Sequence, residues 1–316
     1  MNIKIGNTPL IKIKYEYNNK KNYFYSKLEY YNLTGSIKDR MVYYIICKAK
    51  ENKMLKDNQP IIEATSGNTG ISLAAIGSYF NHKVHIFMPE WVSVERKKLM
   101  EMYGAEVHLI SKEEGGFLKC IEEADKLALE INGFRPNQFS NYDNVLAHYE
   151  TTGKEIINQL PDVKYFVSGI GTGGTLIGIG KRLKEKNVKI YAFEPDSLAL
   201  ITKGINKGEH KIEGIGDDFI PKIVDLDIIE DIFLINDLDS INMARKLAKE
   251  LGLGVGISSG ANLLASILLN EKVNDKIVTV FPDDNKKYLT TLLSDKIDNN
   301  PNFLSNKIKL INYEMV

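Results

Sequence analysis

The sequence predicts an α/β protein with two open, mostly parallel, twisted sheets that carry helices on both faces. Short apolar segments alternate with longer segments of helical periodicity, which is typical of strand–helix–strand units in a parallel sheet. The alternation runs through residues 60–131 and resumes after residue 145, so two such layers are expected. A length of 316 residues also favours two domains over one.

Three strand–helix pairs are predicted in the first half of the chain. Apolar runs such as "VHIFMP" have the length of buried strands, and "GFLKCIEEADKLALEI" repeats apolar residues with the period of a helix. The expected strands are residues 60–65, 84–89 and 106–110, and the expected helices are residues 70–80, 93–104 and 116–131.

The same pattern is predicted in the second half. The expected strands are residues 165–170, 189–194, 232–235 and 276–281, and the expected helices are residues 149–160, 175–186, 239–252 and 262–270. No proline-rich linker marks a boundary, and we expect one near residue 145. We therefore assign residues 36–145 to an N-terminal domain, and residues 1–35 and 146–316 to a C-terminal domain. The polar tail from residue 295 is expected to form a loosely attached strand or arm.

Composition limits the possible partners. Forty-one basic and 41 acidic residues cancel, so no overall field attracts nucleic acid or an anionic membrane. The two cysteines, Cys47 and Cys120, cannot build a disulfide scaffold, and the N-terminus lacks an apolar signal core. We expect a cytoplasmic protein that acts on a small molecule, without a nucleic-acid or membrane partner.

Four glycine-rich turns are the candidate binding sites, because ligands of open α/β sheets bind where strands run into helices. They are "TSGNTG" at 65–70, "GIGTGGT" at 169–175, "IEGIGDDF" at 212–219 and "GISSGAN" at 256–262. The first gathers hydroxyls, an amide and free backbone N–H groups before a helix, which favours an anionic ligand. An ordinary helix cap built from Ser, Thr or Asn is the alternative.

The turn at 169–175 allows a second interpretation. Gly169, Gly171 and Gly174 match GxGxxG, and Glu194 ends the next strand about 20 residues later, as a nicotinamide dinucleotide site requires. Against a nicotinamide-dependent oxidoreductase, the motif lies halfway along the chain and leaves "TSGNTG" without a role. A phosphate cradle and a tight turn for helix packing are also consistent with these glycines.

Two further site classes find little support. "GISSG" matches the GxSxG elbow of hydrolases, which needs a histidine after the serine, but the last histidine is His210. No two of the five histidines have the spacing of a zinc motif such as HExxH. The sequence therefore predicts no metal ligand.

Lys38 has an unusual position. It opens a predicted helix, at the positive end of the helix dipole, which is unfavourable for a cation. A lysine near two anion-binding turns is the minimum set for pyridoxal 5'-phosphate, which needs an amine, a phosphate cup and a pocket for the substrate carboxylate.

From these residues the chain resembles the cysteine synthase and cystathionine β-synthase family of pyridoxal-phosphate enzymes, known as fold type II or tryptophan synthase β-subunit-like. The resemblance covers nearly the whole chain, from Ile5 to about Thr291. Its motifs occur in the family's order: "IGNTPL", "GSIKDR", "TSGNTGISLA", "MPEWVSVERKKLMEMYGAEVHL", "HYETTGKEI", "GTGGT", "EPDS", "GIGDDFIP" and "GISSGAN".

The resemblance implies roles for individual residues. Lys38 would hold the cofactor and then remove the α-proton of the substrate. The implied cofactor-binding residues are Asn68 at the ring hydroxyl, Ser258 rather than Ser259 at the ring nitrogen, and Gly171, Thr172, Gly173, Gly174 and Thr175 at the phosphate. The implied substrate-carboxylate residues are Thr65, Ser66, Thr69 and Gln138.

The implied chemistry is β-elimination to an aminoacrylate followed by addition of a nucleophile at the β-carbon. Asp217 and Asp218 stand where sulfide-using cysteine synthases usually carry small residues, and Asp218 matches the aspartate of "GIGYDFIP" in cystathionine β-synthases. Because a carboxylate repels hydrosulfide but can deprotonate water or a thiol, we predict that Asp218 is a general base. An exposed turn aspartate or a helix cap is the alternative for Asp218.

The predicted reaction is thus conversion of L-cysteine to hydrogen sulfide and L-serine or a thioether. The alternative is synthesis of cysteine from O-acetyl-L-serine and sulfide. The family resemblance also implies a homodimer and a mobile subdomain at about residues 89–131, which would close over the substrate.

Overall fold

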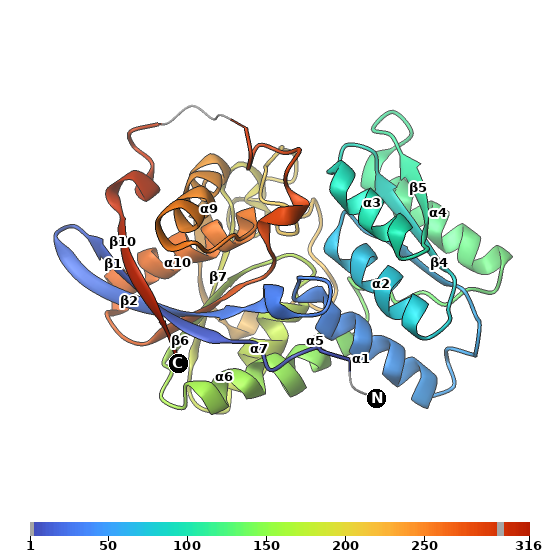
Figure 1. Ribbon diagram of the computed structural model, residues 1–316, viewed down its shortest axis with the longest axis horizontal. Helices are drawn as coiled ribbons and strands as arrows, with labels where there is room; N and C mark the ends of the chain where they lie inside the picture. The colour runs from blue at the N-terminus through green and yellow to red at the C-terminus, as the bar shows by residue number, and fades with distance from the viewer. Residues whose placement is uncertain (1–2, 296–299) are drawn as a thin grey trace.

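The computed structural model describes residues 3–295 and 300–316 and confirms the predicted fold class (Figure 1). One sheet has the strand order β10-β1-β2-β9-β6-β7-β8, and the other has the order β3-β4-β5. Strand β1 pairs antiparallel with β2 and β10, and the other neighbouring strands pair in parallel. The chain therefore forms two mostly parallel sheets, as the alternating pattern predicted.

The small sheet has helices on both faces, because successive strand residues point to opposite sides. Ile61 and Ile86 pack on the side of α1 and α2, and Ile62 and Phe87 pack on the side of α4. Its strands are β3 (Ile61–Ala64), β4 (Val84–Pro89) and β5 (Glu106–Ile110), and its helices are α2 (Asn68–Tyr79), α3 (Val94–Met102) and α4 (Gly116–Glu130). The bounds predicted for these elements thus lie within two residues of the observed ones.

The parallel part of the large sheet is covered in the same way. Val167 packs towards α9 and α10, and its neighbour Phe166 packs towards α7. The strands are β6 (Tyr165–Gly169), β7 (Lys189–Pro195), β8 (Ile229–Ile235) and β9 (Ile277–Phe281). The helices are α7 (Gly174–Lys184), α9 (Asp237–Leu251) and α10 (Ile257–Val273).

A hairpin of β1 (Leu10–Tyr17) and β2 (Lys20–Leu28) extends this sheet, and the sequence pattern did not predict it. Asn18 and Asn19 form its two-residue turn with φ angles of 50° and 59°. Asparagine tolerates this left-handed backbone, and the turn matches the twist of the two strands. Strand β10 (Lys309–Met315) lies beside β1, so the polar tail ends in a strand.

The remaining helices connect the two sheets and the loops. They are α1 (Lys38–Glu51), α5 (Asp143–Ala147), a π-helical segment (His148–Thr152), α6 (Gly153–Gln159) and α8 (Leu200–Lys203). Short 3₁₀ turns lie at Glu29–Tyr31, Asp196–Leu198, Leu226–Ile228, Asn285–Lys287 and Leu304–Lys307. Among the described helices, none combines the length and apolar character that crossing a bilayer requires.

A buried charge network fixes α1 to the large sheet and to α6. The Arg40 guanidinium contacts Glu29 at 2.6 Å and Glu155 at 2.7 Å, and Lys27 contacts Glu155 at 2.8 Å. The side chains of Arg40 and Glu29 are fully buried. Burial acts to raise the pKa of Glu155, but the hydrogen bonds and charge of Arg40, helped by Lys27, bring that pKa down to about 2. Because buried charges are costly unless they are paired, the network specifies where α1 starts.

Replacing Arg40 with Met should lower the free energy of unfolding by about 3–5 kcal/mol, because it leaves the buried Glu29 carboxylate without its cation. The control is Lys48→Met, which breaks the exposed Lys48–Glu51 pair and should cost less than about 1 kcal/mol. Urea unfolding followed by circular dichroism measures both. Equal losses in the two variants would contradict the structural role of the network.

Candidate functional site

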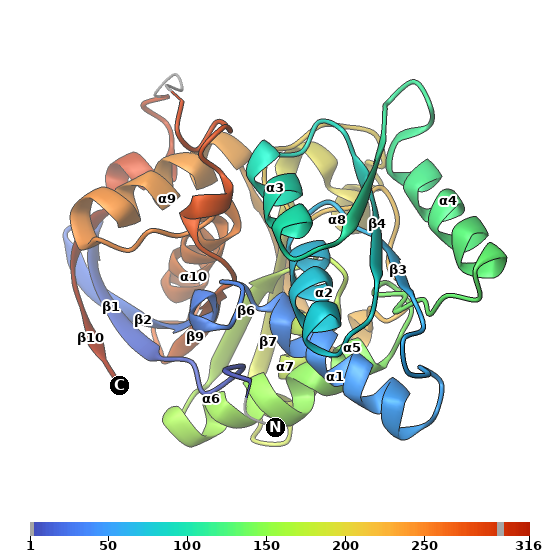
Figure 2. The same ribbon diagram turned by 45° about the vertical axis from the view of Figure 1, so that its right-hand side comes forward.

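A cavity of about 540 Å³ lies where loops from both sheets meet. It is bordered by the carboxyl end of β4 at Pro89, the start of α2, and the loop before residue 219. Helices α2 and α3 lie on the side of the small sheet that faces the large sheet (Figure 2). The predicted residues Lys38, Thr65, Ser66, Asn68, Thr69, Gln138, Thr172 and Asp218 all line this cavity.

Lys38 is the first residue of α1 and faces this cavity. The preceding residue is anchored by a hydrogen bond from the Ile37 N–H to the Pro282 carbonyl at 2.8 Å. Burial lowers the pKa of Lys38, and the charges of Asp217 and Asp283 oppose this shift. Because an amine must be uncharged to attack a carbonyl, the burial prepares Lys38 to act as a nucleophile.

The start of α2 brings the predicted carboxylate-binding residues together. The Thr69 hydroxyl donates to the Gln138 side-chain oxygen at 2.6 Å, and the Gln138 amide donates to the Ala64 carbonyl at 3.2 Å. The Thr65 hydroxyl accepts from the Gly67 N–H at 3.1 Å, and Ser66 is exposed at the cavity wall. This arrangement leaves N–H groups of the first helical turn available to a carboxylate.

A smaller adjoining cavity of about 50 Å³ is lined by all the predicted cofactor residues except Gly174: Lys38, Asn68, Gly171, Thr172, Gly173, Thr175 and Ser258. Gly173 has a φ of +91°, and a β-carbon there would lie 2.5 Å from Val224. Gly174 begins α7 and donates its N–H to the Thr172 hydroxyl at 3.4 Å. The positive φ of Gly173 favours glycine in this tight turn, which places the N-terminus of α7 at the cavity.

His148 supports this loop from behind. It is fully buried, and its two ring nitrogens lie 3.0 Å from the Thr152 hydroxyl and 3.3 Å from the Thr175 hydroxyl. Burial, followed by the charges of Lys38 and Arg40, holds the pKa of His148 well below its usual range. The ring is therefore neutral, and it orients Thr175 without adding charge to the site.

These residues fit pyridoxal phosphate. Lys38, the glycine turn before α7 and Ser258 line one cavity. An amine suits the aldehyde of the cofactor, the turn suits its phosphate, and the serine hydroxyl suits its pyridine nitrogen. Among the described residues, the Asn68 side-chain oxygen is buried without a hydrogen-bond partner, although it faces this cavity. An unpaired buried polar atom is costly, so a ligand that pairs with Asn68 is expected.

The two consecutive aspartates differ in their surroundings. Both line the large cavity, but Asp218 is exposed, whereas Asp217 is half-buried. Burial, followed by the charge of Asp218, raises the pKa of Asp217 to about 6, and Lys38 opposes this shift. Gly214 and Gly216, with φ angles of +83° and +75°, set the direction of this loop. Sequence alone did not indicate which aspartate interacts with Lys38.

Asp283 is a site residue that the sequence analysis missed. Its carboxylate accepts hydrogen bonds at 2.8 Å from the Asn68 amide and from the Tyr288 hydroxyl, and it is fully buried. It therefore orients Asn68 and places a negative charge close to Lys38. The segment "PDD" shows an aspartate here, but only the hydrogen bond to Asn68, 215 residues away along the chain, indicates its role.

Arg96 and Glu213 form a second feature that the sequence did not reveal. Arg96 is only 2% exposed, forms an ion pair with Glu213, and lies 4.6 Å from the centre of the Tyr288 ring. Because Glu213 precedes Asp217 in the same loop, this pair ties α3 to the loop that borders the cavity.

Comparisons with known proteins agree with this geometry. The sequence profile of a family described as "Pyridoxal-phosphate dependent enzyme" matches residues 1–283. Cysteine synthase B of Campylobacter jejuni is 41% identical over 292 residues, which are 91% of this chain and 95% of that protein.

Two solved structures are similar over almost the whole chain. The hydrogen sulfide-producing enzyme Fn1055 of Fusobacterium nucleatum has a TM-score of 0.94 and 46% identity, over 99% of this chain and 97% of that one. An aspartate-to-asparagine variant of Fn1055, in complex with an α-aminoacrylate intermediate, has a TM-score of 0.95 and 45% identity. The match again covers 99% of this chain and 97% of that one.

Replacing Glu213 with Gln should loosen the loop from Glu213 to Asp218, because it removes the ion pair with the buried Arg96. Amide hydrogen exchange of peptides from this loop should become several-fold faster. The matched control is Glu209→Gln, which removes an exposed ion pair with Lys112 shortly before this loop. Similar exchange in the two variants would show that the Arg96–Glu213 pair does not hold the loop.

Proposed function

The chain belongs to the family of pyridoxal-phosphate-dependent enzymes, and we propose that it catalyses β-elimination and β-replacement on L-cysteine. The proposed products are hydrogen sulfide and either L-serine or a thioether amino acid. The family match favours pyridoxal phosphate over the nicotinamide cofactor that the GxGxxG spacing allowed. The single observation that supports cysteine as the substrate is the position of Asp217 and Asp218 in the cavity of Lys38.

When bound, pyridoxal phosphate supplies an electron sink that makes the α-proton of an amino acid removable and its β-substituent a leaving group. In our proposal Lys38 holds the cofactor, takes the α-proton and later returns a proton to the α-carbon. Residues of the α2 start orient the substrate carboxylate, and the turn before α7 binds the cofactor phosphate. The Ser258 hydroxyl, unlike a carboxylate, does not keep the ring nitrogen protonated, which favours loss of the β-substituent over transamination.

The carboxylates of the cavity explain why sulfide is proposed as the leaving group. Two like unit charges 4 Å apart near a protein surface repel each other by about 4 kcal/mol. Hydrosulfide is an anion at neutral pH, so the charges of Asp217 and Asp218 disfavour its entry as a nucleophile. Water or a thiol enters uncharged and gives up its proton to a carboxylate as its oxygen or sulfur bonds to the β-carbon.

Asp217 and Asp218 have different proposed roles when the nucleophile loses its proton. Asp218 is the base predicted from sequence, and its exposure lets it exchange protons with solvent. Asp217 lies closer to the chemistry, since its pKa is affected by the charge of Lys38, and a pKa of about 6 suits a general base near neutral pH. We propose that Asp217 accepts the proton and that Asp218 keeps the pKa of Asp217 raised.

Cysteine synthesis from O-acetyl-L-serine and sulfide is the second candidate. It is supported by the likeness to cysteine synthase B of Campylobacter jejuni over 91% of this chain. Cysteine synthesis needs the same lysine, phosphate-binding turn and carboxylate-binding residues. These residues therefore do not distinguish the two reactions.

We also propose the organisation of the protein. The three strands of the small sheet lie within residues 36–145, and the seven strands of the large sheet lie within residues 1–35 and 146–316, which supports the division into two domains. Residues 89–131 border the cavity from one side and are proposed to move over the substrate. A homodimer in the cytoplasm is proposed from the family resemblance and the lack of a disulfide scaffold.

Incubation of the holoenzyme with L-cysteine alone should release hydrogen sulfide and form L-serine or a thioether, identified by mass spectrometry. A second incubation with O-acetyl-L-serine and sulfide should form cysteine at a lower kcat/KM. Lys38→Ala should abolish both reactions, and Lys272→Ala, which removes an exposed lysine outside the cavity, should retain them. A kcat/KM that favours O-acetyl-L-serine and sulfide would establish the synthase instead.

The rate of β-replacement should rise with pH through about 6, because Asp217 must lose its proton before it can act as a base. Asp217→Asn should lower this rate by about 10²–10⁴-fold, the usual contribution of a general base, while a single burst of hydrogen sulfide persists. Asp218→Asn should move the rise to lower pH, because Asp218 raises the pKa of Asp217. Stopped-flow sulfide detection and product analysis over roughly pH 5–8, the range around this pKa, measure both. Loss of replacement in Asp218→Asn alone would assign the base to Asp218.

A further inference from the structure

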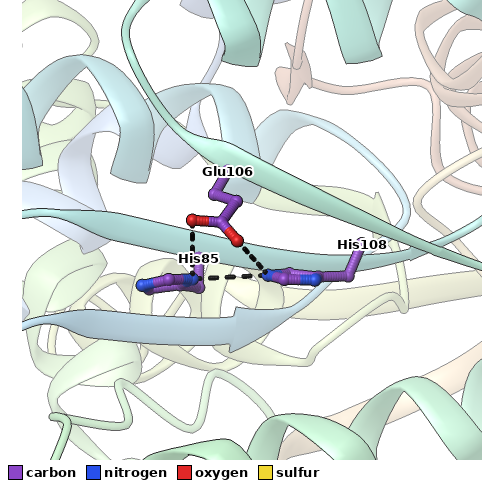
Figure 3. A group of neighbouring side chains, drawn as sticks. All are labelled: His85, Glu106 and His108. Carbon is purple, nitrogen blue, oxygen red and sulfur yellow. Dashed lines mark hydrogen bonds and ion pairs between the residues drawn. The ribbon is translucent and has the colours of Figure 1, made fainter. Parts of the chain in front are cut away.

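Three metal-binding side chains meet on the small sheet, away from the cavity of Lys38. His85 of β4 lies opposite Glu106 of β5 in the strand register, and His108 follows Glu106 on the same face of β5. The His85 Nδ1 and His108 Nε2 atoms are 3.3 Å apart, and each lies 3.7 Å from a Glu106 carboxylate oxygen. Figure 3 shows both nitrogens directed towards each other beneath the carboxylate.

The spacing of these atoms suits a tetrahedral ion. Zinc binds histidine nitrogen at about 2.0–2.1 Å and carboxylate oxygen at about 2.0–2.2 Å. Two nitrogens 3.3 Å apart subtend an angle of about 105° at an ion about 2.1 Å from each, which is near the tetrahedral angle. The nitrogen–oxygen distances of 3.7 Å exceed by only about 0.3 Å the roughly 3.4 Å between two ligands of a tetrahedral zinc ion, so Glu106 can become the third ligand after a small movement.

The surroundings limit how the ligands move. His85 is buried at 6% exposure, and the His108 ring stacks on the Phe87 ring with centroids 4.4 Å apart. The two imidazoles have centroids 5.6 Å apart and planes 19° apart, so each must turn towards the carboxylate to bind an ion. Glu106 is half exposed and leaves an open side for a water ligand.

We propose that His85, Glu106 and His108 bind one divalent transition-metal ion of the zinc type, which clamps β4 to β5. Two imidazoles and one carboxylate are a ligand set suited to zinc, nickel or copper rather than to calcium or magnesium. The sequence predicted no metal ligand because no spacing rule covers residues brought together by two parallel strands. The site differs from the catalytic cavity, in which none of these three residues takes part.

Lys83 provides a test of this site. Its ammonium lies 3.0 Å from the Glu106 carboxylate, and Lys83 directly precedes β4. An incoming cation must displace Lys83 from Glu106, so the lysine competes with the metal. Removing its charge should therefore strengthen metal binding, whereas the variant has no reason to do so if the three side chains form only a hydrogen-bonded cluster.

Titration of the holoenzyme with Zn²⁺ in an isothermal calorimeter, without substrate, tests the proposal. We expect one ion per chain, at least ten-fold weaker binding in Glu106→Gln and in His108→Gln, and several-fold tighter binding in Lys83→Met. The control Glu101→Gln removes a carboxylate that pairs with Lys97 on α3 and should not change the affinity. Circular dichroism of each variant establishes that it is folded.

Co²⁺ provides a second readout, because a tetrahedral site gives intense visible absorption bands. These bands should appear in the wild type and be lost in His108→Gln. Zn²⁺ should also raise the thermal unfolding midpoint of the wild type but not of His108→Gln, since the ion joins two strands. Binding that is equal in the wild type, Glu106→Gln and His108→Gln, or absent in all three, would overturn the proposal and leave a histidine–histidine hydrogen bond.

Discussion

The position of Lys38 at the first turn of α1 is the constraint on which the rest of the site depends. A lysine at the positive end of a helix dipole is unfavourable when it is charged, so its neighbours must hold the helix in place. Asp39 accepts hydrogen bonds from the Thr34 N–H and hydroxyl and from the Ser72 hydroxyl, which ties α1 to α2. Arg40 ties the same turn to the large sheet and α6. The two residues that follow Lys38 thus join the start of α1 to α2, to α6 and to the large sheet.

The sequence predicted the parts of the site that lie close together along the chain. Lys38 and the glycine turns could be recognised because one short segment supplies both the residue and the backbone geometry that presents it. Contacts between distant segments could not be predicted in this way. The Asn68–Asp283 hydrogen bond spans 215 residues, and the Arg96–Glu213 pair spans 117 residues. Each depends on how the two sheets face each other, which no local pattern encodes.

The fold shows the same limit. Alternating apolar segments predicted the parallel strands, because buried strands between helices have a strong pattern. The sequence analysis did not predict the β1–β2 hairpin, although β1 alternates apolar and polar residues and Asn18 and Asn19 are favourable turn residues, because the partner strand β2 shows no such alternation. Likewise, the motif "GDD" identified two aspartates but not where their side chains point. Those directions depend on the positive φ angles of Gly214 and Gly216, which only the folded chain reveals.

The pKa values of Lys38 and Asp217 shift towards each other. Burial is the largest cause in both cases: it lowers the pKa of the amine and raises that of the carboxyl group to about 6, although their mutual attraction opposes both shifts. A proton can therefore reside on either group at a smaller cost than in water. In the proposed reaction, Lys38 passes a proton to the α-carbon, and Asp217, which is ionised above about pH 6, accepts one from the incoming nucleophile. Arg96 forms an ion pair with Glu213, and the loop that follows Glu213 carries Asp217, whose charge acts on Lys38. The loop that Arg96 holds and the reactive lysine are thus parts of one electrostatic arrangement.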